Sequence, residues 1–287
     1  MIMHNRESTD ILRENAADTK TASQALNDLQ YGILYDLSKM AAADPDITPA
    51  SLYADVISKD LCTKDFAQFC RHCAQHGFHS DILASLLPDT AKTNTASDSF
   101  TVAYLKNTYS DNAFSAFAGL LKNAKAYPGT SFQSACEEVY YGRCTACILP
   151  FFTSEDGTLI SFLRMIAKYD LKIAMTCDVS VQNGDNILRF ALLRHALSLP
   201  QSRVVHVQIN TVLSGKLSIG TFLASCEHTG ASVTDLVTLP LTYTNDFPSY
   251  TIRFRTDISN LPSLILFLHS VLDSYTLEGI FTMIDFN

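Results

Sequence analysis

Two Cys-x-x-Cys pairs are the residues whose spacing points most directly to chemistry. Cys70-Arg71-His72-Cys73 is followed by His76 and His79, and Cys144-Thr145-Ala146-Cys147 is the second pair. Two such pairs can bind Zn²⁺. However, the first pair shares an apolar helix face with two phenylalanines, and cysteines three apart on a strand point to opposite faces. We therefore expect structural cysteines and no metal ion.

A second group of polar residues, Ser154-Glu155-Asp156-Gly157, precedes an expected helix. Hydroxyl and carboxylate oxygens at such a position satisfy the free N–H groups of the first helical turn. A helix start can also bind the carboxylate of a ligand. We favour a helix cap and keep ligand binding as the alternative.

Composition excludes several classes of function. The sequence has no Gly-rich phosphate loop, no G-x-S-x-G and no H-E-x-x-H. Its net charge of −8 disfavours nucleic-acid and anionic-membrane partners, since both require clustered basic residues. No apolar run reaches the roughly 18 residues of a membrane span, and the first residues lack the apolar core of a signal peptide. We expect a cytoplasmic protein with reduced cysteines, no cofactor, and no nucleic-acid or membrane partner.

The elements that would position these residues fall into three segments. The 287 residues, 47 % of them hydrophobic, suffice for two or three folded domains. Apolar residues recur every three or four positions between Ala22 and Met40, which predicts a long amphipathic helix. Thr63 can cap another helix that ends at Gly77. We expect a helical domain over residues 1–88 and a polar linker at 89–98.

Residues 99–199 alternate strands with helices, which predicts an α/β layer with a mostly parallel sheet. The expected strands are 100–105, 144–152, 171–179 and 187–195, and the expected helices are 110–124, 131–141 and 157–169.

Residues 200–287 have the order strand, helix, strand, strand, helix, strand. Asn260 and Pro262 mark the start of the second helix. This order is typical of a ferredoxin-like unit, in which two helices cover one face of an antiparallel sheet. The expected elements are 203–213, 218–228, 232–241, 250–257, 261–274 and 277–285.

Several stretches resemble the prephenate dehydratase family in their order and spacing. Thr108-Tyr109-Ser110 is similar to the family's opening strand–turn–helix, and Leu149 to Ser154 with Gly157 is similar to its V-P-I-E-N-S-x-x-G stretch. Asn186-Ile187-Leu188-Arg189-Phe190 resembles its N-x-T-R-F signature. The segment after residue 200 resembles the ACT regulatory domain that follows in this family, with Gly215-Lys216-Leu217 in the place of G-A-L.

The chain departs from the family at the positions that carry chemistry. The catalytic Thr of the family's T-R-F is Leu188 here, which has no hydroxyl group. The Glu-Asn of V-P-I-E-N-S is Phe152-Thr153. The E-S-R-P phenylalanine-binding signature aligns with Val237-Thr238-Leu239-Pro240, in which only the Pro remains. The resemblance therefore implies a relative without dehydratase activity.

A deletion is a further departure. The family's dehydratase domain has two lobes that hold the substrate between them, whereas only the short stretch Ser180 to Asp185 stands where the second lobe would begin. About 80 residues of a small domain are missing there. We expect a single α/β lobe, half of a fold of the type II periplasmic-binding-protein kind.

The fold class that follows is a multidomain α+β and α/β protein. Its parts are a helical domain (1–88), a linker (89–98), a prephenate dehydratase-like α/β lobe (99–199) and an ACT-like βαββαβ domain (200–287). The position of the helical domain, and Leu12-Arg13, resemble chorismate mutase. Because ACT units associate edge to edge, we also expect a homodimer.

The function implied by the resemblance is a role related to L-phenylalanine biosynthesis. The preferred hypothesis is a catalytically inactive protein that binds a small metabolite, such as an amino acid or another carboxylate, in a regulatory role. The alternatives are an active prephenate dehydratase or chorismate mutase, and a structural or interaction module without a ligand. The expected ligand-binding residues are Thr108, Ser110, Ser154, Gly157, Arg189, Gly215, Lys216 and Leu217.

Overall fold

The computed structural model describes residues 51, 63–75, 100–180, 186–213, 217–239 and 248–284. The helix expected between residues 22 and 40, the linker at 89–98, and the predicted ligand residues Gly215 and Lys216 lie outside this part of the chain. Within it, no helix has the length and apolar character needed to cross a membrane.

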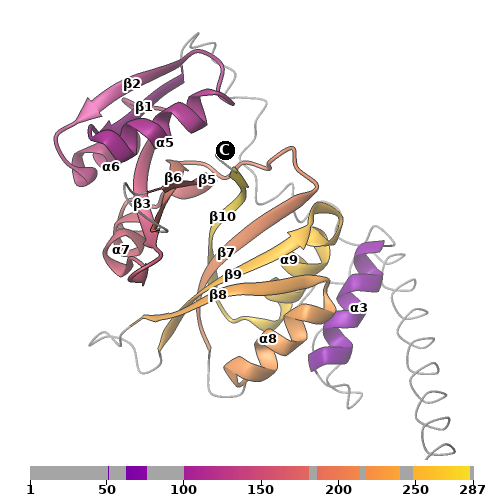
Figure 1. Cartoon of the computed structure of the whole chain (residues 1–287). Coiled ribbons are helices and arrows are strands. Elements are labelled where there is room, and N and C mark those ends of the chain that lie inside the picture. Colours follow the sequence, from indigo (N-terminus) through magenta and orange to yellow (C-terminus); the bar gives the residue numbers. More distant parts are fainter. Residues whose placement is uncertain are drawn as a thin grey trace, which may run out of the picture.

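The described chain forms a mixed α/β protein built on one large sheet (Figure 1). The strands follow the order β2-β1-β3-β6-β5-β10-β7-β9-β8, and the short β4 pairs with β3. The strands are β1 (Phe100–Leu105), β2 (Ala124–Gly129), β3 (Ala146–Thr153), β4 (Gly157–Thr158), β5 (Lys172–Ser180), β6 (Ile187–Arg194), β7 (Val204–Val212), β8 (Ala231–Leu239), β9 (Ser249–Asp257) and β10 (Tyr275–Ile284). The helices are α3 (Thr63–Gln75), α5 (Thr108–Ala118), α6 (Phe132–Tyr140), α7 (Ile160–Lys168), α8 (Ile219–His228), the 3₁₀ turn η1 (Ile258–Asn260) and α9 (Leu261–Val271).

The first half of the sheet, which we call the lobe, consists of β1 to β6 with helices on both faces. Helix α5 packs on one face through Phe117, in a cluster that includes Phe190. Helices α6 and α7 cover the other face, where Val139 and Leu163 join Phe151. The sheet here is mixed rather than mostly parallel: β2 and β3 run parallel to β1, but β6 lies antiparallel between β3 and β5. The reason is that residues 181–186 alone join β5 to β6, and so short a connection produces an antiparallel pair.

The expected helix over residues 110–124 is wrong in its second half. Helix α5 ends at Ala118, and Asn123 adopts a positive φ of 52° just before the chain enters strand β2. Strand β2 was not predicted because its sequence is mostly exposed and contains Pro128. A proline is tolerated there because β2 forms the edge of the sheet, where its missing N–H breaks no ladder.

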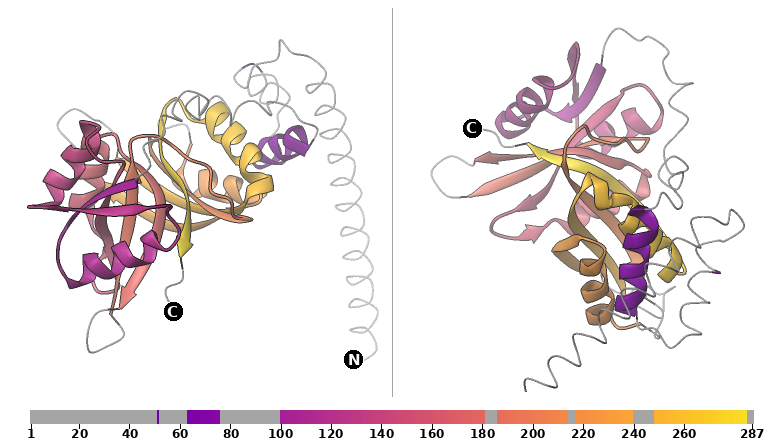
Figure 2. Two further views of the ribbon diagram at one scale, coloured as in Figure 1. Left: turned by 90° about the horizontal axis from the view of Figure 1, so that it is seen from above. Right: turned by 90° about the vertical axis from the view of Figure 1, so that its right-hand side faces the viewer.

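The second half, which we call the C-terminal unit, follows the order β7-α8-β8-β9-α9-β10. Its strands are ordered β10-β7-β9-β8 and all neighbours are antiparallel. Helices α8 and α9 lie on one face, and helix α3 packs against both of them (Figure 2). The predicted apolar face of α3 is confirmed: its buried residues join the same core, and the Phe66 and Phe267 rings lie 6.2 Å apart.

The lobe and the C-terminal unit share a seam, because β10 pairs parallel to β5. Gly279 lies opposite Ile173, and a Cβ atom at Gly279 would approach the Ile173 carbonyl oxygen to 2.6 Å. The backbones can come this close only because residue 279 has no side chain. The sheet is thus continuous across residue 200, where the sequence suggested a boundary.

Candidate functional site

The first group of predicted ligand residues lies at the N-terminus of α5. Asn107 is the N-cap, and its side-chain oxygen accepts a hydrogen bond from the Ser110 N–H at 2.9 Å. Thr108 is exposed, whereas Ser110 is fully buried, and its Oγ has no hydrogen-bond partner among the described residues. Of the two, Thr108 alone is exposed to solvent.

The expected helix cap at Ser154 to Gly157 is wrong. Ser154 to Asp156 form the turn between β3 and β4, in which the Thr153 hydroxyl accepts a hydrogen bond from the Asp156 N–H at 2.8 Å. Gly157 adopts a φ of +71°, which suits glycine and lets the chain reverse into β4. Helix α7 begins only at Ile160, and its N-cap, Leu159, makes no side-chain cap. The Ser154 Oγ instead accepts a hydrogen bond from the Ile187 N–H at 2.9 Å.

Arg189, the predicted carboxylate-binding residue, is engaged in an ion pair. Its Nε and Nη2 donate to the two carboxylate oxygens of Asp178 at 2.5 and 2.7 Å, and its guanidinium lies 5.1 Å from the centre of the Phe152 ring. Phe190 faces α5, and side chains alternate along a strand, so Arg189 points to the opposite face of the sheet. The structure therefore does not bring Arg189 together with the α5 residues Thr108 and Ser110.

Two further positions that the resemblance singled out are apolar contacts in the described structure. Leu188, which the resemblance aligns with a catalytic threonine of the prephenate dehydratases, packs against the cluster beneath α5. Leu217, from the G-A-L-like turn, packs against the core of the C-terminal unit.

The cysteines of both Cys-x-x-Cys pairs are buried. Burial raises the pKa of Cys70 well above its ordinary value, and raises that of Cys73 to about 12. Neutral thiols in an apolar core are poor nucleophiles and poor metal ligands. Within the described ranges, no three His, Cys, Asp or Glu side chains are arranged to hold a metal ion.

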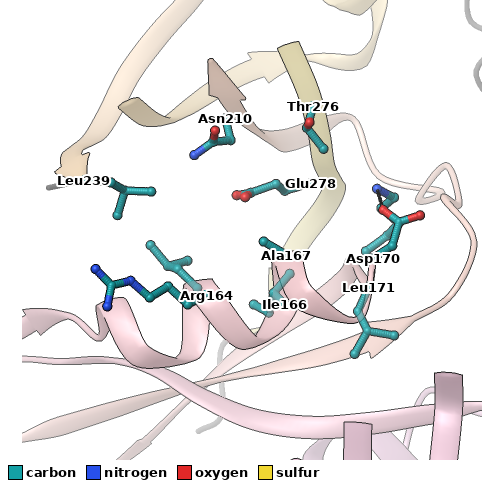
Figure 3. Close-up of a pocket in the computed structure, with 11 residues that line it drawn as sticks. Arg164, Ile166, Ala167, Asp170, Leu171, Asn210, Leu239, Thr276 and Glu278 are labelled. Carbon is teal, nitrogen blue, oxygen red and sulfur yellow. Dashed lines mark hydrogen bonds and ion pairs between the residues drawn. The ribbon is translucent and has the colours of Figure 1, made fainter. Parts of the chain in front are cut away.

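A cavity of about 370 Å³ lies where α7 of the lobe meets the C-terminal unit (Figure 3). Its apolar wall includes Leu163, Ile166 and Leu239, and its polar groups include Arg164, Asn210 and Glu278. The Glu278 side chain extends from β10 into this space, above Ala167 of α7. The full lining is Leu163, Arg164, Ile166, Ala167, Asp170, Leu171, Lys172, Asn210, Leu239, Thr276 and Glu278.

Glu278 is a buried carboxylate, only 4 % exposed. Its Oε2 accepts a hydrogen bond from the Gln208 Nε2 at 2.8 Å. Burial raises the pKa of Glu278, and the Gln208 hydrogen bond and the charges of Lys172 and Arg253 oppose this rise. Glu278 was not among the residues predicted from the sequence, although a lone glutamate within the apolar strand Tyr275–Ile284 is an informative signal.

Arg253 connects Glu278 to the rest of the interface between lobe and C-terminal unit. Its Nε and Nη2 donate to the Gln208 Oε1 at 3.0 and 2.8 Å, and its Nη1 lies 3.5 Å from Asp235. The guanidinium also lies 5.1 Å from the centre of the Phe151 ring of the lobe. Burial lowers the pKa of Arg253 to about 10, a value at which the side chain still carries its charge at neutral pH.

The second contact across this interface comes from β4. The Thr158 hydroxyl donates to the Asp235 Oδ2 at 3.0 Å, so the same aspartate contacts Arg253 of its own unit and Thr158 of the lobe. The C-terminal unit is therefore hydrogen-bonded to the lobe through Asp235.

Comparison with known proteins identifies the fold. Neither a protein-family model nor a curated protein matches the sequence. A solved structure of prephenate dehydratase from Arthrobacter aurescens in complex with L-Phe matches 63 % of this chain and 90 % of its own, with 13 % identity and a TM-score of 0.51. GqqA, described as a novel type of quorum quenching acylase, matches 63 % and 94 % with 16 % identity and a TM-score of 0.50. Prephenate dehydratase from Streptococcus mutans matches 66 % and 100 % with 18 % identity and a TM-score of 0.49.

At these identities the likeness establishes the fold, which is prephenate dehydratase-like. The same fold occurs in a protein described as an acylase, so it does not by itself determine the reaction or the ligand.

Proposed function

We propose that this chain is a non-catalytic relative of the prephenate dehydratases that binds a small metabolite, such as an amino acid, in a regulatory role related to phenylalanine biosynthesis. The observation that carries the loss of activity is the pair Leu188 and Arg189. Leu188 packs in an apolar cluster where the family has a catalytic hydroxyl. The Arg189 guanidinium is already hydrogen-bonded to the Asp178 carboxylate. A proton donor and a free carboxylate-binding group are both needed to expel water and carbon dioxide from prephenate.

The arrangement of the lobe supports this proposal. A second dehydratase lobe would be inserted between the strands that correspond to β5 and β6, and only residues 181–186 join them here. Among the described residues there is no second lobe that could close a cleft over the substrate and exclude water from a reaction.

The C-terminal unit supports a regulatory role. Its βαββαβ order and its β10-β7-β9-β8 strand order suit an ACT-like domain, and an amino acid is the ligand in one structural neighbour. We also propose the domain division 1–88, 89–98, 99–199 and 200–287, with a helical first domain derived from chorismate mutase. A cytoplasmic homodimer belongs to the same proposal, and sedimentation equilibrium would measure its mass.

The proposal predicts binding without turnover. Isothermal titration calorimetry on the full chain would use phenylalanine, tyrosine, tryptophan, prephenate and chorismate. We expect heat from at least one of the five, and no formation of phenylpyruvate from prephenate or of prephenate from chorismate.

Two outcomes would contradict it. Turnover of prephenate or chorismate would establish an active enzyme of the phenylalanine pathway. A matched preparation of Arg189→Met identifies contamination, since a contaminating enzyme would act equally in both samples. Absence of binding by all five compounds would favour a structural or interaction module.

A further inference from the structure

The cavity between α7 and the C-terminal unit contains a carboxylate that is only partly satisfied. Gln208 donates to Oε2 of Glu278, and among the described residues none donates to Oε1. An ionised carboxylate in a buried position is strongly unfavourable unless a cation or further donors reach it. The side chain extends into the cavity, so a bound molecule can contact it (Figure 3).

The nearby cations of the protein already have other partners. The Lys172 ammonium lies 2.7 Å from Asp170, at one side of the cavity. The Arg253 guanidinium donates to Gln208 and lies near Asp235. Glu278 therefore receives no direct ion pair from the described residues, and its free oxygen is suited to a cation supplied from outside.

The remaining lining indicates what kind of cation fits. Leu163, Ile166 and Leu239 provide an apolar wall, which suits an organic body rather than a hydrated metal ion. Arg164 and Asp170 are exposed at the cavity, so it is accessible from solvent. A volume of about 370 Å³ lies within the usual range for small-molecule sites.

A second charge lies on the lobe side. Arg164 makes no ion pair with any residue in the described ranges, and it projects from α7 on the side of the cavity near Leu239. Glu278 and Arg164 thus present opposite charges along one cavity, with apolar side chains beside them. This combination matches a molecule with an ammonium group, an apolar body and, optionally, a carboxylate.

We propose that this cavity binds a small primary ammonium compound with an apolar body, whose ammonium contacts Glu278 Oε1 and whose carboxylate, where it has one, contacts Arg164. The assignment of an amino acid to this site rests on the proposed function. The recognition of an ammonium group by Glu278 does not.

Three compounds with the same phenyl group distinguish the contributions of the ammonium and the carboxylate to binding. L-Phenylalanine carries both groups, 2-phenylethylamine carries only the ammonium, and 3-phenylpropionate carries only the carboxylate. Calorimetry on the wild-type chain should show binding in the order phenylalanine, phenylethylamine, phenylpropionate.

Two isosteric or near-isosteric variants test the contacts. Glu278→Gln keeps an acceptor for Gln208 but removes the charge, and should weaken phenylalanine and phenylethylamine by about tenfold or more. Arg164→Met should weaken phenylalanine and phenylpropionate and leave phenylethylamine within about twofold. Glu227→Gln, which removes an exposed carboxylate on α8, is the matched control and should leave all three affinities unchanged.

The outcomes separate this inference from the proposed function. If phenylethylamine does not bind at millimolar concentration, or binds equally to wild type and Glu278→Gln, the inference is overturned. If phenylalanine binds and Glu278→Gln does not change it, the site is elsewhere and the proposed function survives. If phenylethylamine binds through Glu278 but none of the five metabolites binds, the proposed function fails and the ammonium site stands.

Discussion

The lobe and the C-terminal unit bury the two faces of one sheet in different ways. In the lobe, α5 covers one face and α6 with α7 covers the other, and both clusters are apolar. In the C-terminal unit, α8, α9 and α3 cover an apolar face, but the opposite face carries Gln208, Arg253 and Glu278. Burying polar groups lowers the stability of a protein unless they form hydrogen bonds, so their presence here requires an explanation. The buried polar groups that still need an explanation therefore lie where the two halves meet, and not at the stretches of the lobe that resemble the family motifs.

The seam between the halves is the feature whose loss should have the largest effect. We expect Gly279→Val to lower the free energy of unfolding by about 3 kcal/mol or more, because its side chain would collide with Ile173 and force β10 away from β5. Urea unfolding followed by far-ultraviolet circular dichroism would measure this change. A single wild-type transition should separate into two in the variant.

Gly220→Ala is the matched control for the seam. Among the described residues, nothing outside the chain neighbours and the backbone of helix α8 itself lies within 4 Å of a Cβ atom at residue 220. We expect this variant to be unchanged or more stable by up to about 1 kcal/mol. Equal urea midpoints for Gly279→Val and Gly220→Ala would show that the two halves do not depend on the close approach at Gly279.

Loss of the polar network formed by Arg253, Gln208 and Asp235 should have the next largest effect on stability. Arg253→Met removes both donors of the Gln208 Oε1 and the ion pair with Asp235, and we expect it to cost about 2 kcal/mol of unfolding free energy. Arg255→Met, two residues along the same strand and exposed, should change stability by no more than about 0.5 kcal/mol. Similar losses in both variants would mean that the buried network adds nothing beyond a surface charge.

The sequence predicted the elements of the C-terminal unit better than the site. Alternating or continuous apolar runs mark its strands, and the Asn260 and Pro262 signal correctly places the start of α9. Strand β2 could not be found, because an exposed edge strand with a proline lacks the apolar pattern. The sheet directions of the lobe were also missed, since alternation of elements alone does not reveal the β5–β6 hairpin.

The cavity could not be predicted from the sequence, for a different reason. Its lining comes from α7, β5, β7, β8 and β10, which are far apart in the chain and meet only through the seam. The family motifs pointed instead to Arg189 and the start of α5, which lie on opposite faces of the sheet. Glu278 could have been noticed as a lone glutamate in an apolar strand, but no sequence motif identifies the group that a single buried charge contacts.

His206 offers a smaller and pH-dependent test of the same polar face. Burial, together with the charges of Arg253, Arg255 and Arg189, lowers the pKa of His206 from 6.5 to about 4. The folded protein therefore keeps this ring neutral, while the unfolded chain binds a proton below about pH 6.5, so stability is lost as the pH falls from 6.5 toward 4. Because the ring is partly exposed and water screens the charges, we expect a loss of about 1–2 kcal/mol.

The variant His206→Gln should remove this loss. Urea unfolding of both proteins at pH 8 and at pH 4.5 would measure it, with the pH 8 pair as the internal control because both side chains are neutral there. Parallel pH dependence in the two proteins would show that neither burial nor the arginine charges lower the pKa of His206.

The smallest expected effect lies in the lobe, at Leu188. We expect Leu188→Thr to cost about 1 kcal/mol, since it places a polar group against the apolar cluster beneath α5. Ile187→Thr, at a neighbouring position that is 37 % exposed, should stay within about 0.5 kcal/mol of wild type.

Neither variant should convert prephenate to phenylpyruvate in an absorbance assay, because the Arg189 guanidinium stays paired with Asp178 in both. Turnover by Leu188→Thr that Ile187→Thr lacks would mean that one side chain separates this lobe from an active enzyme. The contrast between an apolar lobe and the polar face where the two halves meet would then be wrong, since the α5 face would hold a working site apart from that single group.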